Sequence, residues 1–219
     1  MTFSPELLTS PFTAIGLHLV AFLLGSIPVG HLIAKMHGID IRRQGSGNTG
    51  ATNVARTIGK KAGVITLLLD AMKGILAVQL ARFVLPHNIF PTPFQPNDLF
   101  STLGVCAVFG HCFSPFLKGK GGKGVATGVG VFLALAPLET FGCIIVFAIA
   151  FAVTRYVSLG SILGAITMPV VIYLGRGVQQ PLLLISVSLT SILVISRHRA
   201  NIARLLAGSE SKFSAKSKS

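Results

Sequence analysis

Residues 125–153 read VATGVGVFLALAPLETFGCIIVFAIAFAV, with Glu139 as the only charged residue of the segment. A run this long and this apolar is typical of a membrane protein, because a helix needs about 20 apolar residues to cross the hydrocarbon core of a bilayer. Pro137 interrupts the run, so it forms either one long helix or two short helices joined at Pro137–Glu139. The choice determines the number of spans and the side on which each loop lies.

The composition of the whole chain also indicates an integral membrane protein. Of its 219 residues, 51% are hydrophobic and only 11% are charged, and the mean hydropathy of +0.74 is too high for an ordinary soluble domain. We expect one membrane domain over residues 1–207 and a basic, disordered Ser/Lys tail over residues 208–219. The first dozen residues carry no cation, so the first apolar run is expected to be a retained span and not a cleaved signal peptide.

Lys and Arg are unevenly distributed between the apolar segments. They concentrate in residues 35–61, 118–123 and 197–218 and at Arg155. The N-terminus, residues 86–98 and the Pro137–Glu139 turn contain none. Cytoplasmic loops of membrane proteins are enriched in Lys and Arg. Dividing residues 125–153 into two helices puts all of these basic segments on one side, with Arg176 as the exception, whereas a single helix leaves one group of cations outside.

We therefore predict an all-α integral membrane protein with about seven transmembrane helices, an outside N-terminus, a cytoplasmic C-terminus and glycine-rich basic loops on the cytoplasmic face. Two of the seven helices are short and are expected to tilt or to end inside the protein. Asp70 and Lys73 lie three residues apart in the second span, so they share a helix face and are expected to form an ion pair. The expected spans are residues 13–36, 62–85, 99–117, the two halves of 125–153, 158–175 and 181–195.

Two glycine-rich basic segments predict a site for anions. Residues 42–56 carry three glycines, three arginines and no carboxylate, and residues 118–124 read KGKGGKG. Glycines allow backbone amides to approach phosphate oxygens, and arginine offers a bidentate fork. A helix that begins at Val125 would add its N-terminus to the second segment. We expect both segments to converge with residues 155–161 and 197–201 at the cytoplasmic membrane surface.

Other classes of function are excluded by what the sequence lacks. Neither glycine-rich segment follows a strand, which a dinucleotide-binding or P-loop fold requires. The cations are scattered between apolar runs, which argues against nucleic acid as a partner. With six carboxylates and no cluster of His and Cys, we expect neither a metal nor a cofactor. A membrane transporter of organic phosphate is the alternative, although its site would lie near the bilayer midplane between repeated halves, and the sequence shows no internal repeat.

Two histidines lie next to the basic segments. His111 precedes residues 118–124, and His198 is flanked by two arginines. His198 and Asn201 are three residues apart, so on a helix they share one face and could hold one ligand. The flanking arginines are expected to lower the pKa of His198 and to keep its ring neutral.

These motifs, taken in order along nearly the whole chain, resemble the PlsY family of bacterial acyl-phosphate:glycerol-3-phosphate acyltransferases. The matching segments are Gly25–Pro28, Gly45–Arg56, Gly110–His111, Phe116–Thr127, Arg155–Ser161 and Arg197–Ile202 with Glu210. The resemblance implies transfer of a fatty acyl group from acyl phosphate to the 1-hydroxyl of sn-glycerol 3-phosphate, giving lysophosphatidate and phosphate. This reaction would be the first committed step of bacterial phospholipid synthesis, at an active site facing the cytoplasm in the inner membrane.

The resemblance also implies roles for individual residues. Ser46, Arg56, His198 and Asn201 are expected to be catalytic. The expected substrate-binding residues are Gly45, Gly47, Asn48, Thr49, Gly50, Asn53, Lys120, Gly121, Gly122, Lys123, Gly124, Ser158 and Ser161. The expected partners are acyl phosphate, glycerol 3-phosphate, the lipid bilayer and the soluble enzyme that makes acyl phosphate.

Three routes are open for activating the attacking hydroxyl and removing its proton. Ser46 could act as a covalent nucleophile, but no carboxylate stands near it in sequence. His198 could act as a general base. The phosphate of the acyl phosphate could also accept the proton itself, and we prefer this option because an activated donor needs positioning and charge stabilisation more than a strong base.

Overall fold

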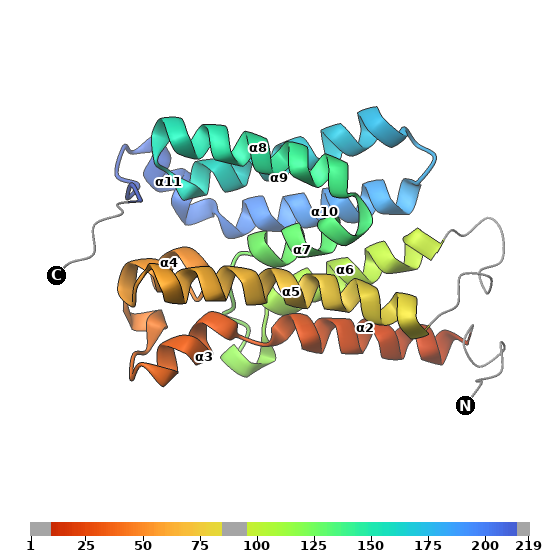
Figure 1. Cartoon of the computed structure of the whole chain (residues 1–219), viewed down its shortest axis with the longest axis horizontal. Coiled ribbons are helices and arrows are strands. Elements are labelled where there is room, and N and C mark those ends of the chain that lie inside the picture. Colours follow the sequence, from red (N-terminus) through yellow and green to blue (C-terminus); the bar gives the residue numbers. More distant parts are fainter. Residues whose placement is uncertain (1–9, 85–95, 214–219) are drawn as a thin grey trace.

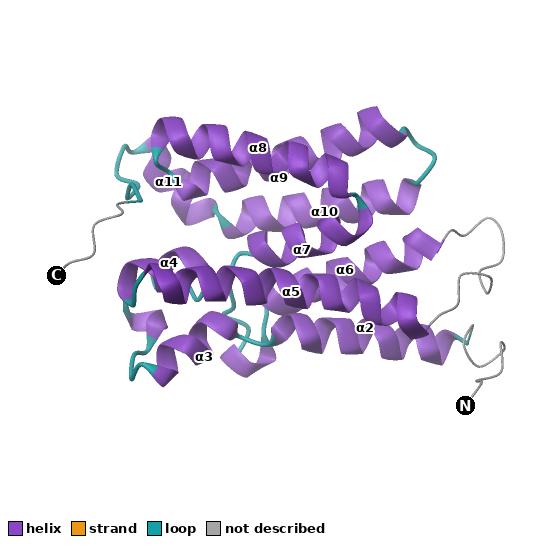
Figure 2. Cartoon of the chain, viewed as in Figure 1, coloured by secondary structure: helices purple, strands orange, loops and turns teal. Residues whose placement is uncertain are grey.

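The structure is a computed structural model that describes residues 10–84 and 96–213, and every regular element within these ranges is a helix (Figures 1 and 2). The α-helices are α2 (Pro11–Ser26), α3 (Val29–Met36), α4 (Ala51–Thr57), α5 (Lys60–Val84), α6 (Pro96–Cys112), α7 (Val125–Leu135), α8 (Pro137–Thr154), α9 (Val157–Arg176), α10 (Pro181–Arg197) and α11 (Arg199–Leu206). Two 3-10 turns, η1 (Ile41–Arg43) and η2 (Pro115–Leu117), complete the set. The long helices run side by side, with both glycine-rich segments in the loops between them.

Each of the seven expected spans is helical, but not all of them are long enough to cross a bilayer. Within the described residues, five helices are sufficiently long and apolar, with α2 and α3 counted as one, and a sixth is gained if α10 is joined to α11 across a bend of 57°. The short helix α7 has 11 residues. At about 1.5 Å per residue it cannot cross a core of about 30 Å. The prediction of an all-α membrane protein is confirmed, and by length and composition five or six of the seven expected helices are long enough to cross a bilayer.

Two apolar segments are interrupted, and the second of these breaks was predicted. The chain breaks between α2 and α3 at Ile27 and Pro28, and Lys73 Nζ donates a hydrogen bond of 2.9 Å to the Ile27 carbonyl that the break exposes. Residues 125–153 divide into α7 and α8 before Pro137, which occupies the first turn of α8. Proline is tolerated there because its missing N–H would have no helical partner.

The helices approach one another most closely where glycines meet a neighbouring backbone. On α2 and α6, a Cβ atom added to Gly25 would collide with the Ala107 carbonyl, and one added to Gly110 would collide with the Phe22 carbonyl. In membranes, small residues at helix interfaces allow such contact between backbones, which provides the packing that lipid cannot supply. The same reciprocal arrangement joins α5 to α7, where Gly74 meets Thr127 and Gly130 meets Ala71.

Arg176, the exception to the one-sided distribution of cations, has a carboxylate partner. Its guanidinium donates to both oxygens of Glu139, at 2.6 and 3.1 Å. The pair joins the start of α8 to the end of α9, at the end of the molecule opposite α4 and α11 (Figure 1). The ion pair explains how a cation is tolerated on the side that otherwise has few.

Residues just beyond the expected domain boundary at residue 207 contact the helices. The Phe213 amide donates to the Arg155 carbonyl at 2.8 Å, and the Phe213 ring packs edge-on against Phe151. Arg56 on α4 donates to the Ser211 carbonyl at 2.8 Å. Residues 208–213 therefore form a C-terminal segment that packs on the helices, and the remainder of the expected disordered tail, residues 214–219, lies outside the described residues.

The reciprocal glycine contact between α5 and α7 predicts that Gly74→Leu destabilises the fold. The new side chain would overlap the Thr127 backbone. Overpacking of this kind lowers the free energy of unfolding by about 1–3 kcal/mol. In a protein of this size, each kcal/mol lowers the midpoint temperature of unfolding by about 2–4 °C. Thermal unfolding in detergent can be followed with a thiol-reactive dye, because Cys106, Cys112 and Cys143 are buried or half-buried. Gly16→Leu is the control, since nothing lies within 4 Å of a Cβ atom there. Equal midpoints for the two variants would contradict the packing argument.

Candidate active site

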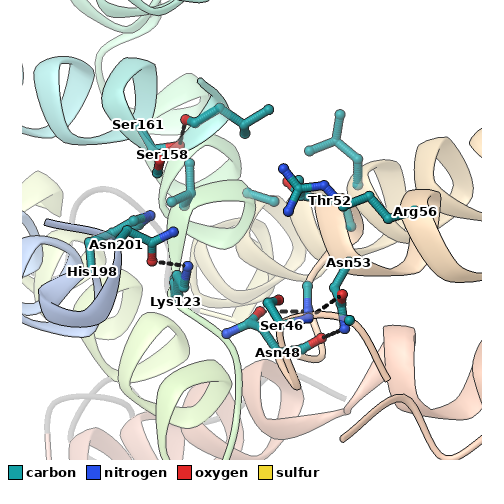
Figure 3. Close-up of a pocket in the computed structure, with 18 of the residues that line it drawn as sticks. Ser46, Asn48, Thr52, Asn53, Arg56, Lys123, Ser158, Ser161, His198 and Asn201 are labelled. Carbon is teal, nitrogen blue, oxygen red and sulfur yellow. Dashed lines mark hydrogen bonds between the residues drawn. The ribbon is translucent and has the colours of Figure 1, made fainter. Parts of the chain in front are cut away.

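A cavity of about 500 Å³ lies between α4, α9, α11 and the start of α7 (Figure 3). Residues of both glycine-rich segments face it, with Ser46 and Asn48 on one side and Lys123, His198 and Asn201 on the other. Its polar and charged lining consists of Ser46, Asn48, Thr52, Asn53, Arg56, Asp70, His111, Lys123, Ser158, Ser161, His198, Asn201, Arg204, Glu210 and Ser211. The predicted convergence of the four basic segments on one site is therefore observed.

Several helices begin at the wall of this cavity. The first residues of α7 (Val125 and Ala126) and of α9 (Val157 and Ser158) line it, as does Asn201 in the first turn of α11. The first amides of a helix have no carbonyl partner within the helix, and the helix dipole places partial positive charge there. The cavity thus presents backbone donors as well as cationic side chains to an anion.

Asn53 holds the first glycine-rich segment in shape. Its side-chain oxygen accepts from the Ser46 amide at 3.0 Å, and its Nδ2 donates to the carbonyls of Gln44 and Asn48 at 2.9 Å each. The residue is only 3% exposed. Because these bonds occupy its amide group, Asn53 is a scaffold of the loop and not a free ligand for substrate. Gly45, with φ +55°, lies so close to Asn53 that a Cβ atom would collide with its side chain.

The other residues of this segment differ in how they reach the cavity. The Ser46 side chain is exposed at the cavity, and Arg56 enters from α4. Asn48 lines the cavity and accepts from the Gly50 amide at 2.8 Å, so it also shapes the turn before α4. Gly47 and Thr49 do not line the cavity, which does not fit their expected role in binding substrate.

Two amides of the second glycine-rich segment are bonded to carbonyls at the end of α6. The Gly121 amide donates to the Cys112 carbonyl at 3.1 Å and the Gly122 amide to the His111 carbonyl at 3.0 Å. Arg197 then donates to the Gly121 and Gly122 carbonyls, at 2.9 and 3.1 Å. These two glycines therefore have no free amide for a phosphate, although both were expected to bind substrate.

Lys123 is the cation that the segment delivers to the cavity. Its ammonium donates to the Asn201 side-chain oxygen. Burial lowers the pKa of Lys123 to about 8. Lys120, also expected to bind substrate, is exposed and lies outside the cavity, so only Lys123 and Gly124 of this segment line it.

Glu210 lines the cavity and was not among the predicted site residues. Its carboxylate is 6% exposed, and one oxygen accepts from Ser158 at 2.7 Å and from Asn201 at 2.6 Å, while the other accepts from Arg204 at 2.6 Å. Burial alone would raise the pKa of Glu210, but these hydrogen bonds lower it below its ordinary value. The family motif contained this carboxylate, yet the Ser/Lys composition around it suggested a disordered tail.

His198 lies directly after α10 and is 3% exposed. Its Nδ1 is 2.7 Å from the Val194 carbonyl, so Nδ1 carries the proton and donates, and Nε2 is the nitrogen that can accept. Burial and, to a smaller extent, the charge of Lys123 together lower the pKa of His198 to about 4. The ring is neutral as predicted, but burial and Lys123 are the causes, instead of the flanking arginines.

A buried charge cluster extends the polar lining toward the middle of the bundle. Asp70 Oδ1 is 2.8 Å from Lys73 Nζ and 3.5 Å from His111 Nδ1, and all three side chains are at most 8% exposed. The predicted Asp70–Lys73 pair is confirmed. Asp70 and His111 also line the cavity, which the spacing of the pair on the helix did not indicate.

An apolar groove of about 400 Å³ adjoins the polar cavity. It lies between α5, α7, α8, α9 and α10 and shares with the cavity Leu67, Gly124, Val125, Ala126, Phe147 and Ser161. A site with a cationic end and an apolar extension fits a ligand that carries both an anionic group and a hydrocarbon chain.

Comparisons with known proteins identify the family of the chain. Residues 15–208 match the family described as Glycerol-3-phosphate acyltransferase. The glycerol-3-phosphate acyltransferase of Trichlorobacter lovleyi is 51% identical over 89% of this chain and 95% of that protein, and the one of Geobacter sulfurreducens is 44% identical over 90% and 95%. The chain therefore belongs to a family of acyltransferases that act on glycerol 3-phosphate.

Solved structures place the chain more narrowly. The integral membrane glycerol 3-phosphate acyltransferase PlsY, in its glycerol 3-phosphate form, matches with a TM-score of 0.84 and 38% identity over 92% of this chain and 96% of that one. Its lysophosphatidic acid form matches with a TM-score of 0.81 and 37% identity over 93% and 96%. The resemblance to the PlsY family is thus confirmed, and the chain is a multi-pass membrane protein of this family.

The role of Asn53 as a scaffold predicts that Asn53→Ala loosens the first glycine-rich segment. Loss of its buried hydrogen bonds leaves backbone groups without partners, at about 1–3 kcal/mol. We expect faster trypsin cleavage after the exposed Arg42 and Arg43, measured by mass spectrometry of the folded protein. Ser46→Ala is the control, because its hydroxyl makes no hydrogen bond within the described residues. Cleavage at the same rate in both variants would show that Asn53 does not hold the segment.

Proposed function

We propose that this protein transfers a fatty acyl group from acyl phosphate to the 1-hydroxyl of sn-glycerol 3-phosphate, giving lysophosphatidate and phosphate. The observation that carries the proposal is the polar cavity, with its cations and helix N-termini, directly beside an apolar groove. Both proposed substrates carry a phosphate, and one carries an acyl tail that the groove can take. The lysophosphatidic acid form of PlsY supports an amphiphilic ligand in this family.

In this proposal the two sides of the cavity serve the two substrates. Lys123, His198 and Asn201, with Ser158 and Ser161, hold glycerol 3-phosphate, and the amides at the start of α7 contribute to binding its phosphate. Ser46 and Arg56 hold the acyl phosphate. Arg56 would supply a bidentate contact to the leaving phosphate. Glu210 keeps Asn201 and Ser158 oriented through its hydrogen bonds.

The chemical step needs no protein nucleophile in this scheme. The 1-hydroxyl oxygen attacks the acyl carbonyl carbon, the bond from that carbon to the phosphate oxygen breaks, and the departing phosphate takes the hydroxyl proton. Within the described residues no hydrogen bond joins the Ser46 hydroxyl to a histidine or a carboxylate. The contacts therefore provide no base that would activate Ser46 as a nucleophile. His198 could position the hydroxyl through Nε2. Orientation of this kind can supply about 7–11 kcal/mol of barrier lowering.

The same proposal gives the protein its place in the cell. The end of the bundle that contains α4, α11 and the two glycine-rich segments would face the cytoplasm of a bacterium, because cytoplasmic loops are rich in Lys and Arg. Glycerol 3-phosphate and the soluble enzyme that makes acyl phosphate would reach the cavity from that side of the inner membrane.

The donor can be tested by following phosphate release from palmitoyl phosphate with purified protein, with and without glycerol 3-phosphate. We expect release that requires glycerol 3-phosphate, formation of an equal amount of lysophosphatidate, and no acyl transfer from palmitoyl-CoA. Transfer from palmitoyl-CoA at a similar rate would overturn the donor assignment. Exchange of glycerol 3-phosphate across a vesicle membrane without any acyl transfer would favour the transporter.

Lys123 predicts how substrate affinity depends on pH. Its pKa of about 8 means that the free protein loses this positive charge as pH rises through about 8. The phosphate stays dianionic there because its second pKa is about 6. The KM for glycerol 3-phosphate should therefore rise by up to about tenfold per pH unit above 8. Lys123→Arg keeps the charge and should flatten this rise. An equal rise of KM with pH in the unmodified protein and in Lys123→Arg would assign the titration to another group.

A further inference from the structure

The apolar groove has a definite direction. Where it meets the polar cavity it is lined by Phe147 and Ser161, and it continues along α8 toward Thr140 and along α9 toward Met168. The step from Gly160 to Met168 on α9 corresponds to about 12 Å at 1.5 Å per residue. The groove therefore has an inner end within the bundle, some distance from the cavity.

Two glycines along the groove are not required by helix packing. A Cβ atom added to Gly164 would lie 3.5 Å from the Cys143 carbonyl oxygen, and one added to Gly128 would lie 3.6 Å from Thr190. Both are ordinary van der Waals distances, unlike the collisions expected at Gly74. Neither glycine has a positive φ, so backbone conformation does not require them either. What their missing side chains provide is space in the groove.

The inner end of the groove is formed by buried side chains in contact. Cys143 Sγ lies 3.5 Å from Met168 Sδ, which joins α8 to α9 across the groove. Cys143 is 8% exposed, Met168 5% and Thr140 2%. The Thr140 hydroxyl is occupied by the Ala136 carbonyl, so it does not make this end a polar site.

We propose that Gly128 and Gly164 keep the groove open for the acyl chain and that the Cys143–Met168 contact closes its inner end, so that these four residues set the acyl-chain length that the protein prefers. The occupant follows from the continuity of the groove with the polar cavity, since a chain whose phosphate is held among Arg56 and Lys123 has this apolar space directly beside it. The inference rests on the proposed function and assigns specificity residues to the same site.

The test is the value of kcat/KM for a series of acyl phosphates of increasing chain length, at saturating glycerol 3-phosphate and fixed detergent. Gly164→Leu fills the groove and should shift the preference toward shorter chains, whereas Met168→Ala opens the inner end and should shift it toward longer chains. Each methylene of the acyl chain that the altered groove excludes or newly accommodates should change kcat/KM by about fourfold. The KM for glycerol 3-phosphate should stay unchanged in both variants.

Gly142→Leu is the matched control, because Gly142 lies on α8, outside the groove lining, and nothing lies within 4 Å of a Cβ atom there. Its chain-length profile should equal that of the unmodified protein. If Gly164→Leu fails to fold, Gly164→Ala and Met168→Ala make the test. If the groove variants fold and are active but keep the chain-length profile of the unmodified protein, the inference is overturned. Absence of activity dependent on glycerol 3-phosphate in the unmodified protein would instead overturn the proposed function.

Discussion

Direct contact between helix backbones is the constraint on which the site depends. Gly74 and Gly130 bring α5 and α7 together with no side chain between them. Within lipid, this packing replaces the hydrophobic driving force that stabilises soluble bundles. It also fixes the start of α7, whose first residues form one wall of the cavity, against the helix that carries Asp70 and Lys73. The contact therefore sets both the fold and the position of the helix N-terminus at the site.

The positive charge of the site is partly offset within the protein. Lys123, Arg56 and Arg204 gather around one cavity, and an unpaired cation is costly where its side chain is buried, as at the half-buried Lys123. Glu210 supplies a carboxylate that pairs with Arg204 and, through Asn201, connects to Lys123. One carboxylate among these three cations leaves an excess of positive charge that can attract phosphate. The pairing of Glu210 also explains why the segment after α11 packs against the bundle although its composition is typical of a disordered tail.

Local chemistry made part of this structure predictable from the sequence. Pro137 begins α8 because its missing N–H needs no helical partner in the first turn, and Asp70 pairs with Lys73 because three residues place them on one helix face. The helices α7 and α10 likewise begin where they were expected, at Val125 and Pro181. The amides of Gly121 and Gly122 could not be judged from the sequence, because they are occupied by carbonyls of residues 111 and 112, and Arg197, distant in sequence, binds the carbonyls of both glycines. Composition concealed Glu210, because one carboxylate among Ser and Lys hardly changes an average.

The C-terminal segment has a consequence for how the protein is made. Glu210 and Ser211 come after every other residue of the cavity in chain order, and they contact Ser158, Asn201 and Arg56, which lie on three different helices. During synthesis, the bundle can insert into the membrane before the Glu210 carboxylate has been added. The carboxylate that offsets part of the positive charge of the site is therefore added only after all of the described helices have been synthesised.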